Sequence, residues 1–177
     1  MTVVLRPTAA LEPADLREIR RLVDLAFAGD FDDDDWAHAL GGLHAVVRDD
    51  DGVVAHGAVV ERQLLLDGRP VRTGYVEAVA VHPAHRRRGH AAAVMAALEA
   101  AVRERYDLGA LGATDDGAAL YRARGWQAWQ GTTWALGPEG GRVRTAEDDD
   151  AVFVLAVAAP LDLRGELVCD WRTGDLW

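Results

Sequence analysis

The chain has 177 residues, a length typical of one domain, and half of them are hydrophobic, which is enough for a sizeable core. It contains no serine and no lysine, which excludes a serine nucleophile and a lysine Schiff base. The formal net charge of −10 disfavours DNA and anionic membranes as partners. We therefore expect a single domain over residues 1–177 that binds neither nucleic acid nor a membrane.

The expected compartment is the cytoplasm. No apolar run approaches the length of a membrane span, and the first residues lack the basic-then-apolar pattern of a secretory signal. The sequence has one cysteine, Cys169, so an internal disulfide is excluded and a reducing compartment fits. We expect Cys169 to be a packing residue.

The first part of the chain predicts a strand, two helices and a hairpin. Apolar residues recur at helical spacing from Pro13 until Gly29, and an acidic run then precedes a short helix around Trp36, which one of the aspartates would cap. The expected strands and turn are, in order, residues 3–6, a strand at 44–48, a hairpin turn at 49–52 and a strand at 53–66.

The rest of the chain continues to alternate strands and helices. The expected elements are a turn at 67–68, a strand at 71–81, a helix from Gly89 to about Arg105, a strand at 108–113, a helix from 115–117 to Gly125, a strand at 126–136, a loop at 137–144, an internal strand at 152–157 and a less regular tail at 161–177. This order predicts the α+β class, with a mostly antiparallel sheet and helices on its faces.

An arginine-rich turn, Arg86–Gly89, joins the expected strand at 71–81 to the helix that follows. Such a turn at a helix start offers free N–H groups, the positive end of the helix dipole and guanidinium donors, which together suit a pyrophosphate. The alternative is a solvated basic loop. The buried strand before the turn and the apolar helix after it favour the phosphate site.

The segment Arg86-Arg87-Arg88-Gly89-His90-Ala91 resembles the acetyl-CoA signature of the GCN5-related N-acetyltransferases, Gln/Arg-x-x-Gly-x-Gly/Ala. This resemblance implies acetyl-CoA as the cofactor and a splayed sheet, whose gap between residues 76–81 and 108–113 admits the pantetheine arm. It also implies a set of cofactor-binding residues, in which Val79 and Val81 act through backbone groups. The set is Val79, Val81, Arg86, Arg87, Arg88, Gly89, His90 and Ala91.

Several further segments resemble the aminoglycoside 2′-N-acetyltransferases, among them residues 29–31, residues 74–77 and the ending from Cys169. The resemblance implies acetylation of a 2′-amine on a polycationic aminoglycoside, and a homodimer. Residues 112–114, Gly-Ala-Thr, depart from a serine-rich family segment, which puts antibiotic preference in doubt. The implied substrate-binding residues are Asp30, Asp35, Glu77, Ala78, Gly112, Asp148, Asp175 and Trp177 with its terminal carboxylate.

Direct acetyl transfer needs a neutral amine, a polarised thioester carbonyl and a protonated leaving sulfur. Glu77 is the candidate general base, acting through a water; alternatively it is a buried acid paired with an arginine. Tyr121 is the candidate acid for the leaving sulfur, and a core tyrosine is nearly as good an interpretation. His82, His85 and His90 do not form a convincing metal-ligand set, so no metal is expected.

Two acidic segments stand out, Asp30–Asp35 and Glu147–Asp150. They are either solvated loops with a helix N-cap in each or a polycation-binding rim. Two other functions stay open: acetylation of another small polyamine or a peptide amine, and a non-catalytic acyl-CoA-binding module. Glu77 and Tyr121 argue against the latter, and the acidic segments argue against a peptide acceptor.

Overall fold

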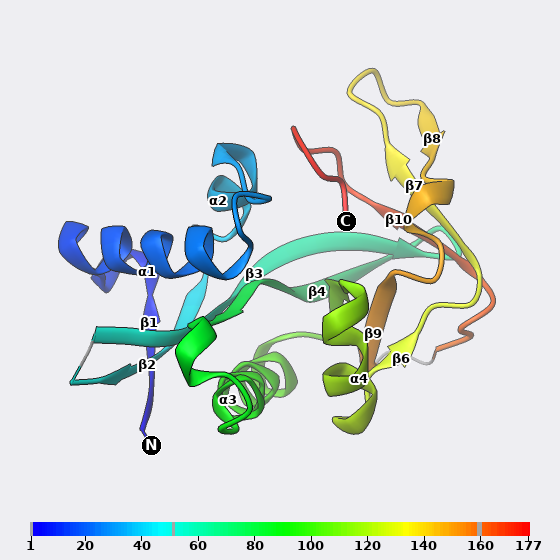
Figure 1. The fold of residues 1–177 in the computed structure, drawn as a ribbon. Coiled ribbons are helices and arrows are strands. Elements are labelled where there is room, and N and C mark those ends of the chain that lie inside the picture. The colour runs from blue at the N-terminus through cyan, green and yellow to red at the C-terminus, as the bar shows by residue number, and fades with distance from the viewer. Residues whose placement is uncertain (1, 51, 159–160) are drawn as a thin grey trace. The chain divides into compact units, whose positions relative to one another are not determined.

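The computed structural model describes residues 2–50, 52–158 and 161–177, which fall into two compact units. Unit 1 consists of Met1–Val60 and Val76–Ala101, and unit 2 of Glu61–Tyr75 and Val102–Trp177. Two long strands, β3 (Gly52–Leu66) and β4 (Arg69–Val81), contribute residues to both units (Figure 1). Each unit is described separately below.

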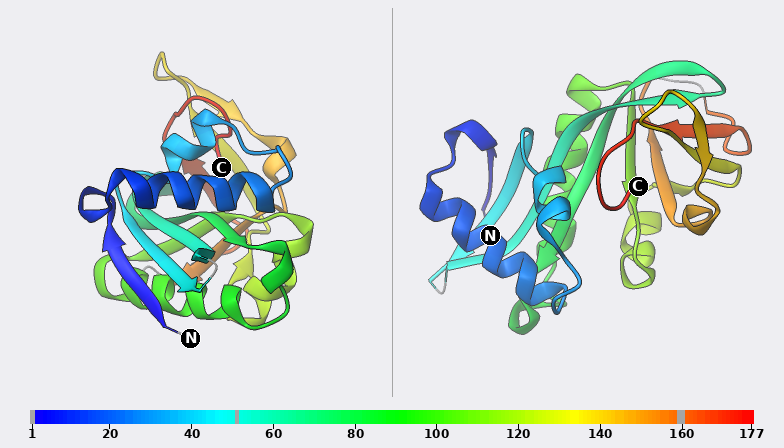
Figure 2. Two further views of the ribbon diagram at one scale, coloured as in Figure 1. Left: turned by 60° about the vertical axis from the view of Figure 1, so that its left-hand side comes forward. Right: turned by 90° about the horizontal axis from the view of Figure 1, so that it is seen from above.

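Unit 1 is built on the first half of β3 and the last part of β4. β2 (Leu43–Asp49) pairs antiparallel with both β1 (Val3–Pro7) and β3. Helices α1 (Pro13–Ala26) and α3 (His90–Arg105) lie on opposite faces of this part of the sheet (Figures 1 and 2). The short helix α2 (Asp33–His38) follows α1 in the chain.

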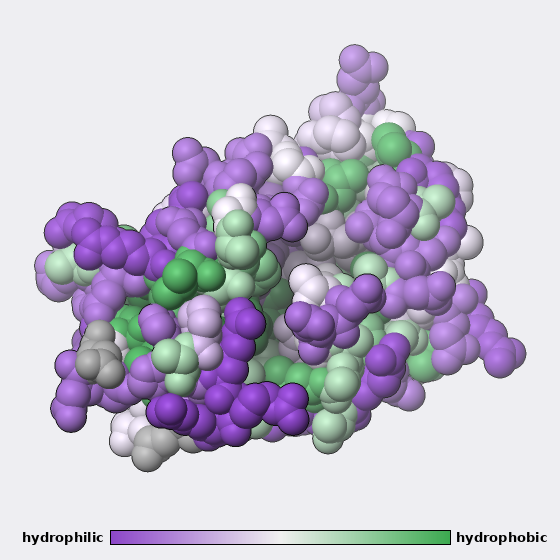
Figure 3. Space-filling model, viewed as in Figure 1, coloured by the Kyte–Doolittle hydropathy of each residue, from purple (hydrophilic) through white to green (hydrophobic). Residues whose placement is uncertain are grey.

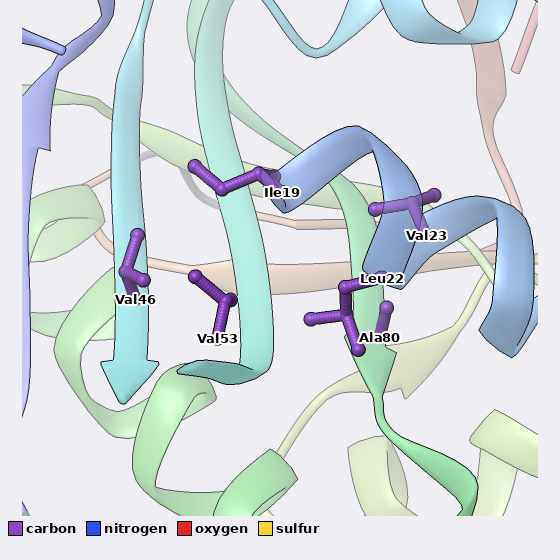
Figure 4. Close-up of a cluster of buried hydrophobic side chains, with 6 residues drawn as sticks. All are labelled: Ile19, Leu22, Val23, Val46, Val53 and Ala80. Atoms are coloured by element: carbon purple, nitrogen blue, oxygen red, sulfur yellow. The ribbon is translucent and has the colours of Figure 1, made fainter. Parts of the chain in front are cut away.

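Helix α1 supplies the apolar core on its side of the unit 1 sheet. Pro13 occupies the first turn, where its missing N–H costs nothing, and Glu12 and Asp15 form a capping box. Most of the α1 surface that faces the viewer in Figure 3 is hydrophilic, as expected for an amphipathic helix. The buried stripe of α1 packs against β2, β3 and the end of β4 (Figure 4). The cluster is Ile19, Leu22, Val23, Val46, Val53 and Ala80.

Helix α3 packs against the opposite face of the sheet, and it lies so close to β3 that only a glycine fits at position 57. A side-chain carbon added at Gly57 would lie 2.8 Å from Val94 Cγ1 and 3.0 Å from Leu98 Cδ1. The register between β2 and β3 shifts between Val47 and Arg48. This shift lets Val53 face α1 while Gly57, four residues later, faces α3.

Unit 2 is a mixed sheet whose strands follow the order β6-β9-β5-β4-β3-β10-β7-β8. β4 pairs parallel with β5 over Thr73–Tyr75 and Leu108–Ala110, and β10 pairs parallel with β7. The pairs β3–β10, β5–β9, β6–β9 and β7–β8 are antiparallel. The elements added here are β5 (Leu108–Gly112), α4 (Asp115–Ala123), β6 (Gln127–Ala128), β7 (Thr132–Leu136), β8 (Arg142–Arg144), β9 (Val152–Ala156) and β10 (Glu166–Cys169).

The expected α+β class and mostly antiparallel sheet are confirmed. Asp67 and Gly68 both have positive φ, 49° and 77°, which a two-residue hairpin turn between β3 and β4 requires. The predicted turn at residues 49–52 includes Asp51, which lies outside the described residues; Asp49 and Gly52 on either side of it are paired. Within the described ranges, no helix is long and apolar enough to cross a bilayer.

Two predictions for the last third of the chain are wrong, and the less regular tail at 161–177 is confirmed apart from one four-residue strand. Residues 126–136 form two short strands, because Gln127–Ala128 pairs with β9 whereas Thr132–Leu136 pairs with β10 and β8. Arg142–Arg144 is strand β8 and not loop, since it pairs with β7. The tail contains β10, which lies between β3 and β7. Both errors concern short strands that are defined by the strands with which they pair.

Candidate active site

The part of β4 that carries Glu77 departs from a regular strand. Ala78 has φ of 51°, in the left-handed region that an alanine rarely adopts. Glu77, Ala78 and Val79 are all half-buried, whereas Val76 and Ala80 on either side are buried. Three successive residues are therefore accessible where a straight strand would alternate. The side chain of Glu77 is therefore more accessible to solvent than that of a core residue.

The arginine-rich turn has the backbone shape of an anion site. Arg87 and Gly89 both have positive φ, 63° and 83°, on either side of Arg88. Alternating handedness of this kind turns successive N–H groups toward one point, and α3 begins directly afterwards at His90. A side-chain carbon added at Gly89 would meet no atom within 4 Å, so the space over the turn is open.

The side chains of this turn divide into two groups. Arg86 donates from Nη2 to the carbonyl oxygen of Ala26 at 3.1 Å, so it fastens the turn to the end of α1. Arg87 and Arg88 are exposed.

The histidines near this turn do not form a metal site. His85 Nδ1 lies 3.2 Å from Asp49 Oδ2, and among the described residues no three His, Cys, Asp or Glu side chains form a cluster that could hold a metal ion.

The two predicted substrate acids of unit 1 lie at the start of α2. Asp32 is the N-cap residue, and the Asp32 N–H donates to Asp35 Oδ2 at 3.0 Å. The prediction that an aspartate caps this helix is confirmed. Asp35 is therefore held by the capping box, while Asp30 is exposed at the end of the preceding turn.

In unit 2, Tyr121 of α4 is buried among aromatic rings. Its ring centroid lies 6.1 Å from that of Phe153 and 6.4 Å from that of Trp126. Burial raises the pKa of Tyr121 to about 12, so the hydroxyl keeps its proton at neutral pH. This environment is compatible with both expected roles, a proton-bearing donor and a core tyrosine.

Gly112 at the end of β5 lies against Trp177. A side-chain carbon added at Gly112 would be 3.2 Å from the Trp177 carbonyl carbon and 3.5 Å from Tyr75 Oη. Trp177 itself is buried and donates from Nε1 to Thr145 Oγ1 at 2.9 Å. Gly112 and Trp177, both implied by the family resemblance, are thus neighbours. A serine at position 112 would require Trp177 to move by a few tenths of an ångström.

The structure also brings together Asp148 and Asp175, two predicted substrate acids far apart in sequence. The pKa of Asp148 is raised to about 6, first by burial and then by the neighbouring carboxylates of Glu147, Asp175 and Asp149, although a hydrogen bond from Thr145 acts in the opposite direction. Carboxylates that are partly buried close together repel one another, and a bound polycation would reduce this repulsion.

A scan of protein families matches residues 8–129 to the acetyltransferase (GNAT) domain. The chain is also 48% identical over 174 residues to an aminoglycoside 2′-N-acetyltransferase from Mycolicibacterium fortuitum, a match that covers 96% of this chain and 89% of that one. The chain is a GNAT acetyltransferase of the same family as this relative. The expected superfamily and family are confirmed.

Solved structures agree on the GNAT fold. A GNAT family N-acetyltransferase (YhbS) from Escherichia coli in complex with CoA has a TM-score of 0.62 at 19% identity, covering 94% of this chain and 89% of that one. A GNAT family acetyltransferase from Brucella melitensis in complex with acetyl-CoA has a TM-score of 0.58 at 19% identity, covering 94% of both chains. At this level of identity the likeness concerns the fold.

Sequence reasoning missed Arg62, which fastens the last residues of this GNAT chain within unit 2. Its side chain is buried; Nε donates to Asp170 Oδ1 at 2.8 Å, Nη2 to the Asp170 carbonyl at 3.0 Å and Nη1 to the Leu176 carbonyl at 2.9 Å. The guanidinium also lies 4.7 Å from the Tyr75 ring centroid. The sequence offers no clear signal for this role, because Arg62 stands between Glu61 and Gln63 in a polar step of β3 and its burial is set by the fold.

Proposed function

We propose that this protein transfers an acetyl group from acetyl-CoA to the 2′-amino group of aminoglycoside antibiotics. The observation that carries the proposal is the 48% identity to the aminoglycoside 2′-N-acetyltransferase over nearly the whole length of both chains. The carboxylates around Asp148 are the physical counterpart, because an aminoglycoside carries several ammonium groups.

The proposed cofactor site is the turn Arg86–Ala91 together with Val79 and Val81. The turn fits a pyrophosphate: its N–H groups converge through the positive φ values at Arg87 and Gly89, and it leads into the N-terminus of α3. Arg87 and Arg88, both exposed, would supply charge, and His90 and Ala91 would contribute the first turn of the helix. The cofactor supplies the activated acetyl thioester; the chain supplies binding and orientation.

Glu77 is the proposed general base. It lies beside the irregular backbone of Ala78, half-buried, where a water can reach its carboxylate. An ammonium group is not a nucleophile, so a proton must leave the acceptor amine before attack, and a carboxylate with access to a water can receive it. Ala78 is proposed to contact the acceptor by its backbone.

Tyr121 is the proposed partner of the leaving sulfur. With a pKa of about 12 its hydroxyl is protonated and able to donate a hydrogen bond. An ordinary thiol has a pKa of roughly 8.5, so Tyr121 is the weaker acid and complete proton transfer to the sulfur would be uphill. We therefore assign Tyr121 the stabilisation of developing negative charge rather than full acid catalysis.

In unit 2, the carboxylates of Asp148 and Asp175 are proposed to bind the acceptor, as are Gly112 and Trp177, which are neighbours. In unit 1, Asp30 and Asp35 are proposed separately as acceptor-binding residues. The acids would pair with ammonium groups. The formal net charge of −10 also favours a cationic ligand over an anionic one. We further propose a cytoplasmic homodimer, which size-exclusion chromatography with light scattering would test through the molar mass.

The decisive experiment compares four polycations. Tobramycin and gentamicin carry an amine at the 2′ position, whereas kanamycin A and amikacin carry a hydroxyl there. Only a 2′ amine can be held at the productive distance from the thioester, so thiol release from acetyl-CoA should be fast with the first pair and slow or absent with the second. NMR of the tobramycin product should place the acetyl group at the 2′ amine.

The outcomes separate the alternatives. Rapid acetylation of kanamycin A, or an acetyl group on another amine of tobramycin, would contradict the assigned position and favour a general polyamine acetyltransferase. Absence of thiol release with every amine, together with acetyl-CoA binding by calorimetry, would favour an acyl-CoA-binding module. Glu77→Gln is the matched site variant, and a wild-type pH profile in this variant would remove Glu77 as the base.

A further inference from the structure

Unit 1 contains a continuous line of hydrogen bonds that the proposed reaction does not use. Thr8 Oγ1 lies 2.8 Å from His44 Nε2, His44 Nδ1 lies 2.9 Å from His56 Nε2, and His56 Nδ1 lies 3.0 Å from the carbonyl oxygen of Ala78. Both imidazole rings are completely buried. The line runs from the residue after β1, across β2 and β3, to β4.

The far end of the line fixes the direction of every bond in it. A carbonyl oxygen can only accept, so the ring of His56 must carry its proton on Nδ1. Burial lowers the pKa of His44 to about 4 and of His56 to about 3, so each neutral ring has one N–H. His56 Nε2 therefore accepts from His44 Nδ1–H, and His44 Nε2 accepts from the Thr8 hydroxyl.

A line that ends on a carbonyl cannot pass a proton onward, because an amide oxygen is not a base at neutral pH. What the line can do is hold a group in place. Its last acceptor belongs to Ala78, whose φ of 51° is unfavourable for a residue with a side chain. The strained residue lies between Glu77 and Val79, one the proposed base and the other a proposed cofactor contact.

We propose that the His44–His56 pair is a positioning device that holds the Ala78 carbonyl and thereby sets the direction of Glu77. This inference rests on the proposed function for the role of Glu77, but not for the hydrogen bonds themselves. His56 is the positioning residue that contacts β4, and His44 donates to its other ring nitrogen and so favours the same tautomer, as an outer hydrogen-bond partner orients an inner imidazole. Neither ring is assigned contact with a substrate.

The first test is nitrogen NMR on the uniformly labelled wild-type protein at neutral pH, without substrates. Free neutral histidine prefers the proton on Nε2, so the expected result is distinctive: both His44 and His56 should be neutral with the proton on Nδ1. A proton on Nε2 of His56 would mean that it cannot donate to Ala78, and would overturn the inference whatever the enzyme acetylates.

The second test compares variants by kinetics. In His56→Leu the donor to Ala78 is lost, and kcat should fall by about 10-fold or more while the KM for the aminoglycoside changes little, because the reacting groups are misaligned but the acids are untouched. His56→Gln can donate to the carbonyl and accept from His44, so it should recover most of kcat. Val23→Ala is the control: it opens a cavity in the α1 core, against which Ala78 also packs, but removes no donor or acceptor of the line.

The control separates positioning from general loss of stability. Val23→Ala should lower the melting temperature and keep the wild-type kcat. If His56→Leu merely resembles Val23→Ala, with lower stability and normal kcat, the inference is wrong. If wild type acetylates no aminoglycoside, the proposed function fails, and the NMR result still decides whether the device exists. Should His56→Leu not fold, the NMR measurement remains decisive.

Discussion

The two acidic segments look alike in sequence and differ completely in the structure. In Asp30–Asp35 the acids stabilise the start of α2. Asp32 accepts from two backbone N–H groups, and Asp35 completes the capping box. Asp33 pairs with Arg20 at 2.9 Å. In Glu147–Asp150 the predicted N-cap is absent, since Thr145 holds that position of the short 3₁₀ turn Ala146–Asp148 and its side chain forms no cap. Asp149 instead pairs with Arg144 and accepts from Thr133.

The carboxylates differ in their exposure to solvent and in the positive charges close to them. The pKa of Asp149 is lowered, chiefly by its hydrogen bond with Arg144, whereas the pKa of its neighbour Asp148 is raised to about 6 by burial and by other acids. A run of acids therefore says little about function until each partner is known. Asp148 is the acid that lacks compensation from an arginine in these interactions, and it is the one that a polycation would compensate.

The largest expected effect comes from removing charge in the second segment. Replacing both Asp148 and Asp175 by Asn should raise the KM for tobramycin about 10–100-fold, the range for losing hydrogen bonds to charged groups, with little change in the KM for acetyl-CoA. Asp33→Asn in the first segment should leave both constants unchanged. Equal effects of the two replacements on the tobramycin KM would break the comparison.

The next effect concerns stability and pH. Because the pKa of Asp148 is higher in the folded than in the unfolded chain, the folded state holds an extra proton between about pH 4 and 6, and stability is lost as the pH rises through this window. Asp148→Asn should therefore be more stable than wild type near pH 7.5 but not near pH 4. Since the side chain is partly exposed, the gain should be about 1 kcal/mol.

Urea unfolding at the two pH values measures this gain directly. A constant difference between wild type and Asp148→Asn at both pH values would show that the side chain has no special protonation behaviour. An Asp148→Asn variant that is less stable near pH 7.5 would contradict the assigned sign.

A third, smaller effect belongs to the first segment. Asp32→Ala removes the N-cap of α2 and should cost about 1 kcal/mol in the free energy of unfolding, because two backbone N–H groups lose their acceptor. Asp32→Asn can still accept and should restore most of the loss. An Asn variant no better than Ala would show that charge near the helix start, and not the cap, is responsible.

The smallest effect is expected at Asp33. Its side chain is 97% exposed, although it pairs with Arg20, so Asp33→Asn should leave the urea midpoint unchanged within error. A clear shift would indicate that the pair matters more than exposed ion pairs usually do, and the first segment would then be more than a capped helix start.

Local patterns predicted the fold well where an element is set by its own sequence. The spacing of Ile19, Leu22 and Val23 identified α1, and the Asp67-Gly68 pair identified a hairpin turn. Strands β8 and β10 escaped because they are short and exist through pairing with β7 and β3. For β10, no local signal encodes its partner β3, which lies about a hundred residues away in the chain.

The candidate site divides in the same way. The arginine turn could be found because its residues are contiguous, and the structure gives it the backbone shape of an anion site. Arg62 and the His44–His56 pair could not be found, since each acts through partners that only folding brings near. Each histidine stands among apolar residues of its strand, which is a weak sign, whereas Arg62 lies between Glu61 and Gln63 and shows no contrast with its neighbours.

Strand β10 has a consequence for how this protein is made. It lies between β3 and β7, so four residues near the end of the chain join β7 and β8 to the rest of the unit 2 sheet. Its partners on β3, Leu65 and Leu66, leave the ribosome about a hundred residues earlier. Unit 2 cannot close its sheet until β10 has been synthesised, about a hundred residues after β3, so a nascent chain is open to aggregation or chaperone binding over that interval.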